Sequence, residues 1–293
     1  MMQRPEPPAA TTWFIGALGR SGSTLLAGLL AGATGGQNAG EINLLWRSVV
    51  GGHTCTCGEQ YEECEIWGPV VTKVRDDMGI SNDRASAIES GLPKQRACVI
   101  QGWGIRLDPL AVELRARTLD ALRATAGTNV VIDNSKLASA AVVARRTDEP
   151  LKIVHLVRDP RGVTFSYSRV VRDPSLNYQA LPRYSATGSA ARWLVTNFAF
   201  ERLSAAAPGL VRRVRYEALV ADPRSELRNL GLTASDVRPE AGLHSIAGNP
   251  WRHSPASAIE LDDTWVDELG TARQRRVSFI TQPLLRRYGY KAH

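Results

Sequence analysis

Short apolar runs alternate along this chain with longer segments that carry apolar residues at helical spacing. The apolar runs cover residues 12–18, 129–133, 152–157 and 210–214. The helical segments cover residues 23–33, 109–126, 138–146, 162–171 and 188–206. Strands that alternate with helices favour parallel pairing through right-handed crossovers. The sequence therefore predicts an α/β fold with a mostly parallel central sheet and helices on both faces.

The chain of 293 residues is long enough for one large domain, and it contains no internal repeat and no obvious linker. Residues 1–11 are polar and Pro-rich, which is typical of a loose tail. We therefore expect one domain over residues 12–293. Residues 50–108 are rich in Gly and Cys, and we interpret them as an irregular insertion over the top of the sheet.

The composition favours a soluble, cytoplasmic protein. Hydrophobic residues make up 43% and charged residues 22%, which excludes general disorder. The longest apolar stretch, residues 24–33, is far shorter than the ~20 residues of a membrane span, and the N-terminus lacks the apolar core of a secretory signal. Four cysteines are too few for a disulfide framework in a chain of this length.

The net charge favours an anionic partner. Lys and Arg number 36 against 29 Asp and Glu, which gives +7 and a pI near 9.5. Most of the basic residues are Arg, whose planar fork suits phosphate or sulfate, although GC-rich coding would produce the same bias.

The first glycine-rich loop joins the first predicted strand to the first predicted helix. It reads Gly-Arg-Ser-Gly-Ser-Thr over residues 19–24, and its backbone N–H groups would lie at the positive end of the helix, where anions bind. Aligned to the nucleotide-triphosphate loop, it has Ala17 in place of the first Gly and Ser23 in place of the Lys. The missing Lys argues against ATP hydrolysis, while Arg20 supplies a cation. An ordinary glycine turn that caps a helix remains the alternative.

A second candidate anion site follows the strand at 152–157. Arg158 lies where this strand ends, and Ser166 lies on the following helix, eight residues further on. Ligands of open α/β sheets bind at the carboxyl ends of the strands. Two anion sites on neighbouring strand ends predict a ligand with phosphates at both ends of a nucleoside.

These two motifs together resemble the sulfotransferases that use 3′-phosphoadenosine 5′-phosphosulfate (PAPS). The likeness extends, with falling specificity, over roughly residues 12–290. It implies that the loop binds the 5′-phosphosulfate through Gly19, Arg20, Ser21, Gly22, Ser23 and Thr24. It also implies that the 3′-phosphate and nucleotide are contacted by Arg158, Ser166, Tyr216, Asn249 and Arg252.

The likeness also implies catalytic residues. Arg in the loop, with Gly-Glu-Ile at 40–42, is similar to bacterial and carbohydrate- or tyrosyl-type members rather than cytosolic aryl-type members. It implies Glu41 as general base, Lys136 as a cation on the bridging oxygen or sulfuryl group, and Arg20 as a further cation. From the residues alone, Glu41 could instead cap a helix over 42–50, and Lys136 could be solvated with Ser135 as a helix cap.

The resemblance implies transfer of a sulfuryl group from PAPS to a hydroxyl of a small-molecule sugar, lipid or natural-product acceptor, with release of adenosine 3′,5′-bisphosphate (PAP). No metal is expected to be required. Residues 50–108 and 172–185 are expected to shape the acceptor side. A P-loop nucleotide kinase is an alternative. A nucleic-acid-binding protein is a weaker one, because no basic face is evident and only 6% of residues are aromatic.

The remaining cysteines and histidines leave several readings open. Cys55, Cys57 and Cys64, with His53 nearby, could bind zinc, form a short disulfide or stay free thiols. His155 lies within an apolar run and is expected to be a core histidine. His244 lies close to Gly248, where a nucleotide contact is one reading.

Overall fold

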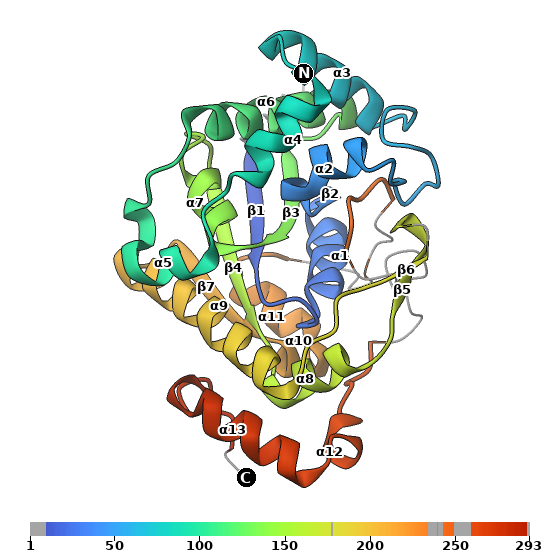
Figure 1. The fold of residues 1–293 in the computed structure, drawn as a ribbon. Coiled ribbons are helices and arrows are strands. Elements are labelled where there is room, and N and C mark those ends of the chain that lie inside the picture. The colour runs from blue at the N-terminus through green and yellow to red at the C-terminus, as the bar shows by residue number, and fades with distance from the viewer. Residues whose placement is uncertain (1–9, 177, 234–238, 240–242, 249–258, 292–293) are drawn as a thin grey trace.

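The computed structural model of the chain describes residues 10–176, 178–233, 239, 243–248 and 259–291 (Figure 1). Five strands in this part of the chain form one sheet in the order β2-β3-β1-β4-β7, and every pairing in it is parallel. The strands of the sheet are β1 (Thr11–Gly16), β2 (Gln37–Gly40), β3 (Val130–Lys136), β4 (Leu151–Val157) and β7 (Val211–Arg215). A separate antiparallel pair consists of β5 (Arg172–Asp173) and β6 (Gln179–Ala180).

Helices cover both faces of the sheet, because successive residues of β1 point to opposite sides. Trp13 and Ile15 pack with α1 and α10, whereas Phe14 packs with α7 and α9. Figure 1 shows α1 and α9 on opposite sides of the strands. The helices are α1 (Ser23–Thr34), α2 (Leu45–Val50), α3 (Trp67–Met78), α4 (Asn82–Ser90), α5 (Gln95–Gln101), α6 (Pro109–Ala126), α7 (Ala138–Arg145), α8 (Pro160–Ser168), α9 (Ala186–Ala206), α10 (Tyr216–Ala221), α11 (Pro223–Asn229), α12 (Trp265–Glu268) and α13 (Thr271–Leu285). Short 3-10 turns are η1 (Ile42–Leu44), η2 (Gly102–Gly104) and η3 (Pro174–Leu176).

The fold class expected from the sequence is confirmed. Helix α6 begins and ends at the expected residues, because its end signals are strong. The Asp108 side chain accepts a hydrogen bond from the Leu110 N–H, Pro109 occupies the first turn, and Gly127 ends the helix with a φ of 64°.

One expectation about local structure is wrong, and one strand was missed. Residues 50–108 are not irregular, because they contain α3, α4 and α5. The valines of α3 form a buried stripe in the core cluster that α6 also enters, and the Gly- and Cys-rich stretch before α3 obscures this periodicity. Strand β2 was not expected at all. Its sequence, Gln-Asn-Ala-Gly, has little strand propensity, and its parallel pairing with β3 holds it in an extended conformation.

Helix α9 crosses β1 at a very close approach. A Cβ atom on Gly16 would lie 2.1 Å from the ring of Phe200, so only glycine allows this contact at the end of the strand. With α9 included, no helix in the described ranges has both the length and the apolar character to cross a membrane.

Candidate active site

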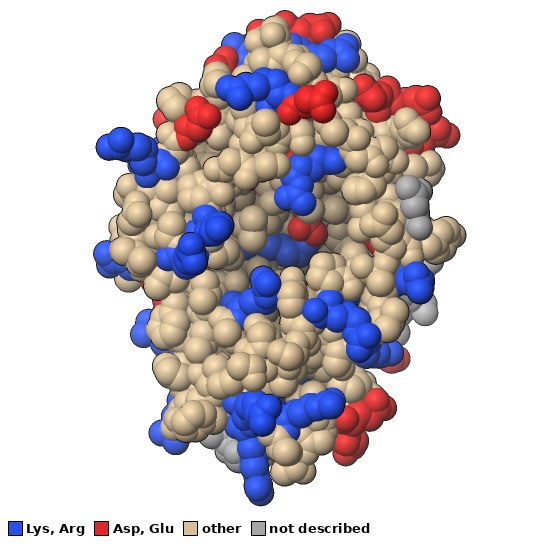
Figure 2. Space-filling model, viewed as in Figure 1, with Lys and Arg blue, Asp and Glu red and all other residues tan. Residues whose placement is uncertain are grey.

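The carboxyl ends of the parallel strands open onto one cavity of about 1510 Å³, which we call the strand-end cavity. Figure 2 shows a hollow in the middle of one face, with basic groups around it and both an acidic and a basic group within it. The sequence-predicted residues that line the cavity are Gly19, Arg20, Gly22, Ser23, Thr24, Glu41, Lys136, Arg158, Ser166 and Tyr216. Ser21 is buried. Asn249 and Arg252 lie outside the described residues.

The loop between β1 and α1 exposes the start of a helix to this cavity. Gly22 precedes α1 with a φ of 88°, and no side chain among the described residues caps the first turn of this helix. The free N–H groups there can hydrogen-bond an anion. Gly22 is also required for packing, because a Cβ atom at this position would lie 2.4 Å from the ring of Tyr216.

Arg20 brings a cation to the same loop. Its backbone is left-handed with a φ of 69°, which is uncommon outside glycine, and Arg20 lines the cavity. Its guanidinium lies 5.8 Å from the centre of the Tyr167 ring. Burial lowers the pKa of Arg20 below its ordinary value. Burial, with a contribution from Tyr184, raises the pKa of Tyr167 to about 12, so its phenol is neutral at physiological pH.

Glu41 and Lys136 meet at the ends of neighbouring strands. Gly40 of β2 pairs with Asp133 of β3, and the Nζ of Lys136 donates a hydrogen bond to Oε1 of Glu41. Lys136 has a φ of 64°. Glu41 precedes η1, but its carboxylate bonds to Lys136 and makes no hydrogen bond to the described backbone of that turn. The carboxylate and the ammonium both line the cavity.

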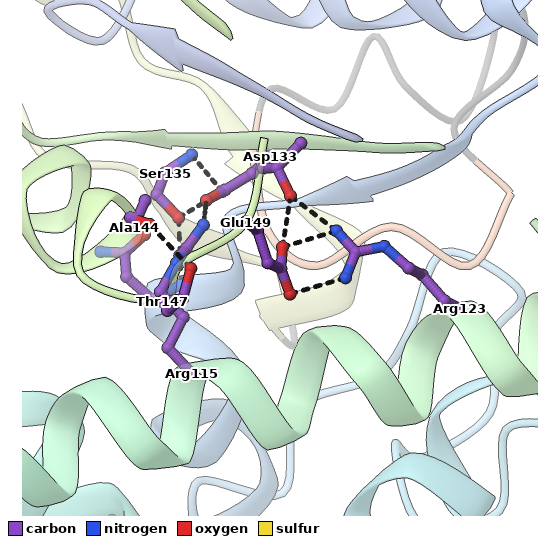
Figure 3. Close-up of polar contacts among 9 residues, drawn as sticks. Arg115, Arg123, Asp133, Ser135, Ala144, Thr147 and Glu149 are labelled. Atoms are coloured by element: carbon purple, nitrogen blue, oxygen red, sulfur yellow. Dashed lines mark hydrogen bonds and ion pairs between the residues drawn. The ribbon is translucent and has the colours of Figure 1, made fainter. Parts of the chain in front are cut away.

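A buried polar network holds the end of β3 (Figure 3). Asp133 is fully buried and accepts a hydrogen bond of 2.6 Å from Nη2 of Arg115. The backbone N–H and the hydroxyl of Ser135 both donate to Asp133, and the Ser135 oxygen accepts from the backbone N–H of Asn43 at 3.2 Å. The hydroxyl proton of Ser135 is thus directed at Asp133 rather than into the cavity. Helix α7 has Leu137, not Ser135, at its N-cap.

A second ion pair lies beside this network and ties α6 to the sheet. Figure 3 shows Arg123 facing Glu149. Nη1 and Nη2 of Arg123 donate to the two carboxylate oxygens at 2.7 Å each. Nη2 also donates to the hydroxyl of Thr12 in β1 at 2.9 Å. The bidentate contact ties α6 to the segment that precedes β4, and the bond to Thr12 ties α6 to the start of β1.

Arg158 lies directly after β4 and contacts both the loop and a distant acidic residue. Its Nη1 donates to the carbonyl oxygen of Arg20 at 3.2 Å. Its Nη2 donates to Asp262, at 2.6 Å to the carbonyl oxygen and 2.9 Å to Oδ2. The guanidinium also lies 4.4 Å from the centre of the Tyr216 ring. Burial alone would raise the pKa of Asp262, but the hydrogen bonds from Arg158 and Thr264 and the positive charges of Arg158 and Arg169 together outweigh it, and the pKa is lowered.

Several cavity residues were not predicted from the sequence. Asp262 is 104 residues from Arg158, and no local pattern links the two. Further basic groups on the cavity wall are Arg47, Lys94, Arg96 and Arg192. Lys94 and Arg96 belong to the segment 50–108, and Tyr184, which lies 3.9 Å from the Arg192 guanidinium, belongs to 172–185. Both segments therefore contribute to the cavity wall.

His155 is a core histidine, as expected. It is almost fully buried in β4 and lies 2.8 Å from Oδ1 of Asn197. Burial lowers the pKa of His155 to about 3, so the ring is neutral. His244 lies beside Cys64 and Glu65.

The arrangement has defined chemical capabilities. The open helix start, Arg20 and Arg158 can bind an anion with two charged ends. Glu41 can accept a proton, and Lys136 can stabilise negative charge next to it. The cavity volume exceeds the ~300–1,000 Å³ common for one small ligand, so it has room for two reactants.

Comparisons with known proteins point to one family. Residues 115–232 match the family model described as the sulfotransferase family. The fold is similar to the sulfotransferase domain from the olefin synthase of Synechococcus PCC 7002, with a TM-score of 0.57, 21% identity and 99% of each chain covered. It is also similar to the sulfotransferase domain from the curacin biosynthetic pathway, with a TM-score of 0.55, 16% identity, and 98% of this chain and 100% of that chain covered. At these identities the two structures support the fold alone. No curated protein sequence matches the chain significantly.

Proposed function

We propose that this chain, in which residues 115–232 match the sulfotransferase family model, is a sulfotransferase that transfers a sulfuryl group from PAPS to a hydroxyl of a small-molecule acceptor and releases PAP. The observation that carries the proposal is the contact of Glu41 with Lys136 in the same cavity as the loop of Arg20. A proton acceptor and two cations thus line the same cavity as a helix start that can hold an anion.

The donor would bind across the ends of β1 and β4. These strands are neighbours, with Gly16 paired to His155, so the loop after β1 and Arg158 after β4 lie side by side. The hydrogen bond from Arg158 to the Arg20 carbonyl brings the two proposed anion sites into contact. One nucleotide could then place its 5′-phosphosulfate on the loop and its 3′-phosphate near Arg158 and Ser166.

The transfer would proceed in line between two oxygens. The acceptor oxygen forms a bond to sulfur while the bond from sulfur to the phosphate oxygen breaks, and that oxygen leaves with PAP. Glu41 takes the proton of the acceptor hydroxyl, and Lys136 and Arg20 stabilise the negative charge that grows on the leaving oxygen. The cationic side chains perform the charge neutralisation that metal ions perform in phosphoryl transfer.

The Glu41–Lys136 contact would change during this cycle. In the ligand-free chain each group neutralises the other, and a bound phosphosulfate offers Lys136 a second anionic partner. The carboxylate would then be left facing the acceptor hydroxyl. The network around Asp133 fixes the β3 end, so the exchange needs movement of the Lys136 side chain only.

Calorimetric titration with PAP tests the proposal against a nucleotide kinase. We expect PAP to bind and ATP with magnesium to bind far more weakly. Clear binding of ATP with magnesium, and no binding of PAP at tens of micromolar, would overturn the proposal. With radiolabelled PAPS and a panel of sugar, lipid and aromatic hydroxyl acceptors, transfer of label would then define the acceptor class.

A further inference from the structure

Three cysteines and a histidine converge outside the strand-end cavity. The Sγ atoms of Cys55, Cys57 and Cys64 and a ring nitrogen of His244 all lie within 4.8 Å of one another. We call these four residues the Cys₃His cluster. Cys55 and Cys64 are buried, Cys57 is exposed, and His244 is partly buried. His53, the histidine nearest in sequence to the cysteines, is not one of the four.

Backbone hydrogen bonds hold the turn that carries the three cysteines. Thr54 and Gln60 form an antiparallel bridge, and the Cys55 N–H donates to the Glu59 carbonyl at 2.8 Å. Between them the chain makes a tight turn, closed by a hydrogen bond of 3.0 Å from the Gly58 N–H to the Cys55 carbonyl. The Cys64 N–H donates to the Gln60 carbonyl at 2.9 Å, which ties the third cysteine to the same turn.

His244 is held with one ring nitrogen facing the sulfur atoms. Its Nδ1 lies 3.2 Å from Sγ of Cys64, and its Nε2 lies 3.0 Å from Oε1 of Glu65. A carboxylate on the far nitrogen keeps the proton there and leaves the near nitrogen free to bind a cation, as in many histidine-ligated metal sites. The His244 carbonyl accepts a hydrogen bond of 2.5 Å from Nε1 of Trp67, so the backbone of His244 is fixed as well.

We propose that Cys55, Cys57, Cys64 and His244 bind one Zn²⁺ ion in a closed tetrahedral site. Thiolate and imidazole are the ligands that zinc prefers, and four protein ligands are the mark of a structural zinc site. Zn–S bonds of about 2.3 Å separate neighbouring ligand atoms by roughly 3.8 Å, so the cluster needs only a small contraction. Binding displaces the thiol protons into solvent. Cys57, exposed at the surface, offers the route of entry.

The ion would connect parts of the chain that are distant in sequence. His244 and Cys64 are 180 residues apart. Ile246 lies two positions after His244. Its N–H donates to the Ala39 carbonyl at 2.9 Å, and its carbonyl accepts from the Glu41 N–H at 2.8 Å. The zinc site would therefore hold the segment that supports Glu41, and it would stabilise the fold by closing a long loop. This role is structural and does not depend on the proposed reaction.

Metal analysis of the purified chain tests the site. The protein is expressed with added zinc and purified without chelators, and its zinc is measured by elemental analysis and by release to a colorimetric chelator. We expect about one zinc ion per chain. Cys64→Ser and His244→Asn should each lose most of it. Cys98→Ala removes the remaining cysteine, which lies in α5 and is buried in the core cluster that includes α7 and α9. His53→Asn removes the neighbouring histidine. Both should keep the zinc.

Cobalt replacement keeps the test informative if the cluster variants fail to fold. The unmodified chain is stripped with a chelator and titrated with Co²⁺. We expect the intense bands of tetrahedral cobalt–thiolate coordination, saturating at one ion per chain, and three fewer reactive thiols in the loaded protein than in the stripped protein. A chain that holds no zinc and binds no Co²⁺ would overturn the proposal. A disulfide between two of the three cysteines, found by mass spectrometry of the native protein, would also overturn it.

Discussion

Glu41 and Lys136 form an ion pair where β2 and β3 end, and although these two residues are 95 positions apart in the chain, the two strands lie next to each other in the sheet. The backbone on both sides is fixed. Ile246 hydrogen-bonds to the Glu41 N–H, and the Asp133 network holds the residues before Lys136. A proton acceptor and a cation are therefore presented together on a rigid sheet edge, which is the arrangement that a transfer reaction needs.

Glu41→Gln should lower turnover and leave donor binding almost unchanged. The amide keeps the size of the side chain but cannot take the proton of the acceptor hydroxyl. Loss of a general base typically costs about 10²–10⁴-fold in rate. Steady-state kinetics should show the fall in kcat, and calorimetry should show PAP affinity within a few-fold of the original chain. Glu113→Gln, on the exposed face of α6, is the charge-matched control. An unchanged kcat in Glu41→Gln would remove Glu41 from the mechanism.

Arg158→Ala should weaken PAP binding. Hydrogen bonds to charged groups contribute about 1.5–3 kcal/mol, so we expect a loss of roughly 10- to 100-fold in affinity. Arg158→Lys should recover only part of it, because an ammonium cannot form the two-pronged contact of a guanidinium. Calorimetric titration measures each constant. Arg212→Ala, an exposed site on β7, changes the net charge equally and should leave affinity intact. Equal effects of Arg158→Ala and Arg212→Ala would mean that only net charge matters.

Asp262→Asn should tighten PAP binding. The Asp262 carboxylate accepts a hydrogen bond from Arg158 at 2.9 Å, so it competes with an incoming phosphate for the same guanidinium. Its side chain is partly exposed, and solvent screens the competition, so we expect a gain of only a few-fold. The gain should shrink at high salt. Asp263→Asn, on the exposed neighbour, provides the matched control. Weaker binding in Asp262→Asn would show instead that the aspartate helps to orient Arg158.

Glu89 should make the free energy of unfolding depend on pH. It lies buried in α4 and accepts hydrogen bonds from the N–H groups of Trp46 and Arg47, at 3.1 and 3.0 Å. Burial raises the pKa of Glu89 to about 7, from an ordinary value of 4.5. Between these values the folded chain holds a proton that the unfolded chain has lost. Stability from this group therefore falls as the pH rises from about 4.5 to about 7, and is constant above that range.

The variant Glu89→Gln isolates this effect. When the pH rises from about 5 to about 8, the original chain should lose free energy of unfolding because Glu89 loses its proton. Glu89→Gln should lose less, by an amount on the order of 2–3 kcal/mol. Denaturant titrations of both proteins at the two pH values measure it. Glu268→Gln, exposed in α12, should keep the original dependence. A parallel dependence in Glu89→Gln and the original chain would mean that Glu89 is ionised in both states.

The sequence predicted those features that local chemistry determines. Helix α6 has a capping Asp, a Pro in its first turn and a closing Gly, so both of its ends could be predicted. The gathering of Arg20, Lys136 and Arg158 at one edge followed from their positions at the ends of expected parallel strands. Strand β2 was not predictable from its own residues, because its extended conformation depends on pairing with β3.

Contacts between residues that are far apart in the chain were also not predictable from the sequence. Asp262 meets Arg158, and His244 meets Cys64, only through tertiary structure, so neither pairing has a local signal. The zinc interpretation considered Cys55, Cys57 and Cys64 together with His53, the histidine that is near in sequence. The fold brings His244 instead.

The left-handed backbone of Arg20 has a consequence for engineering. A residue with a side chain at such a position lowers the stability of the folded chain by about 1–2 kcal/mol, because its Cβ crowds the backbone, and glycine avoids this cost. A screen that selects for heat resistance alone would therefore favour Arg20→Gly and would discard the cation at the mouth of the helix. Thermostable variants of this chain are best evolved with this position held constant, because here resistance to heat and the capacity to bind an anion oppose each other.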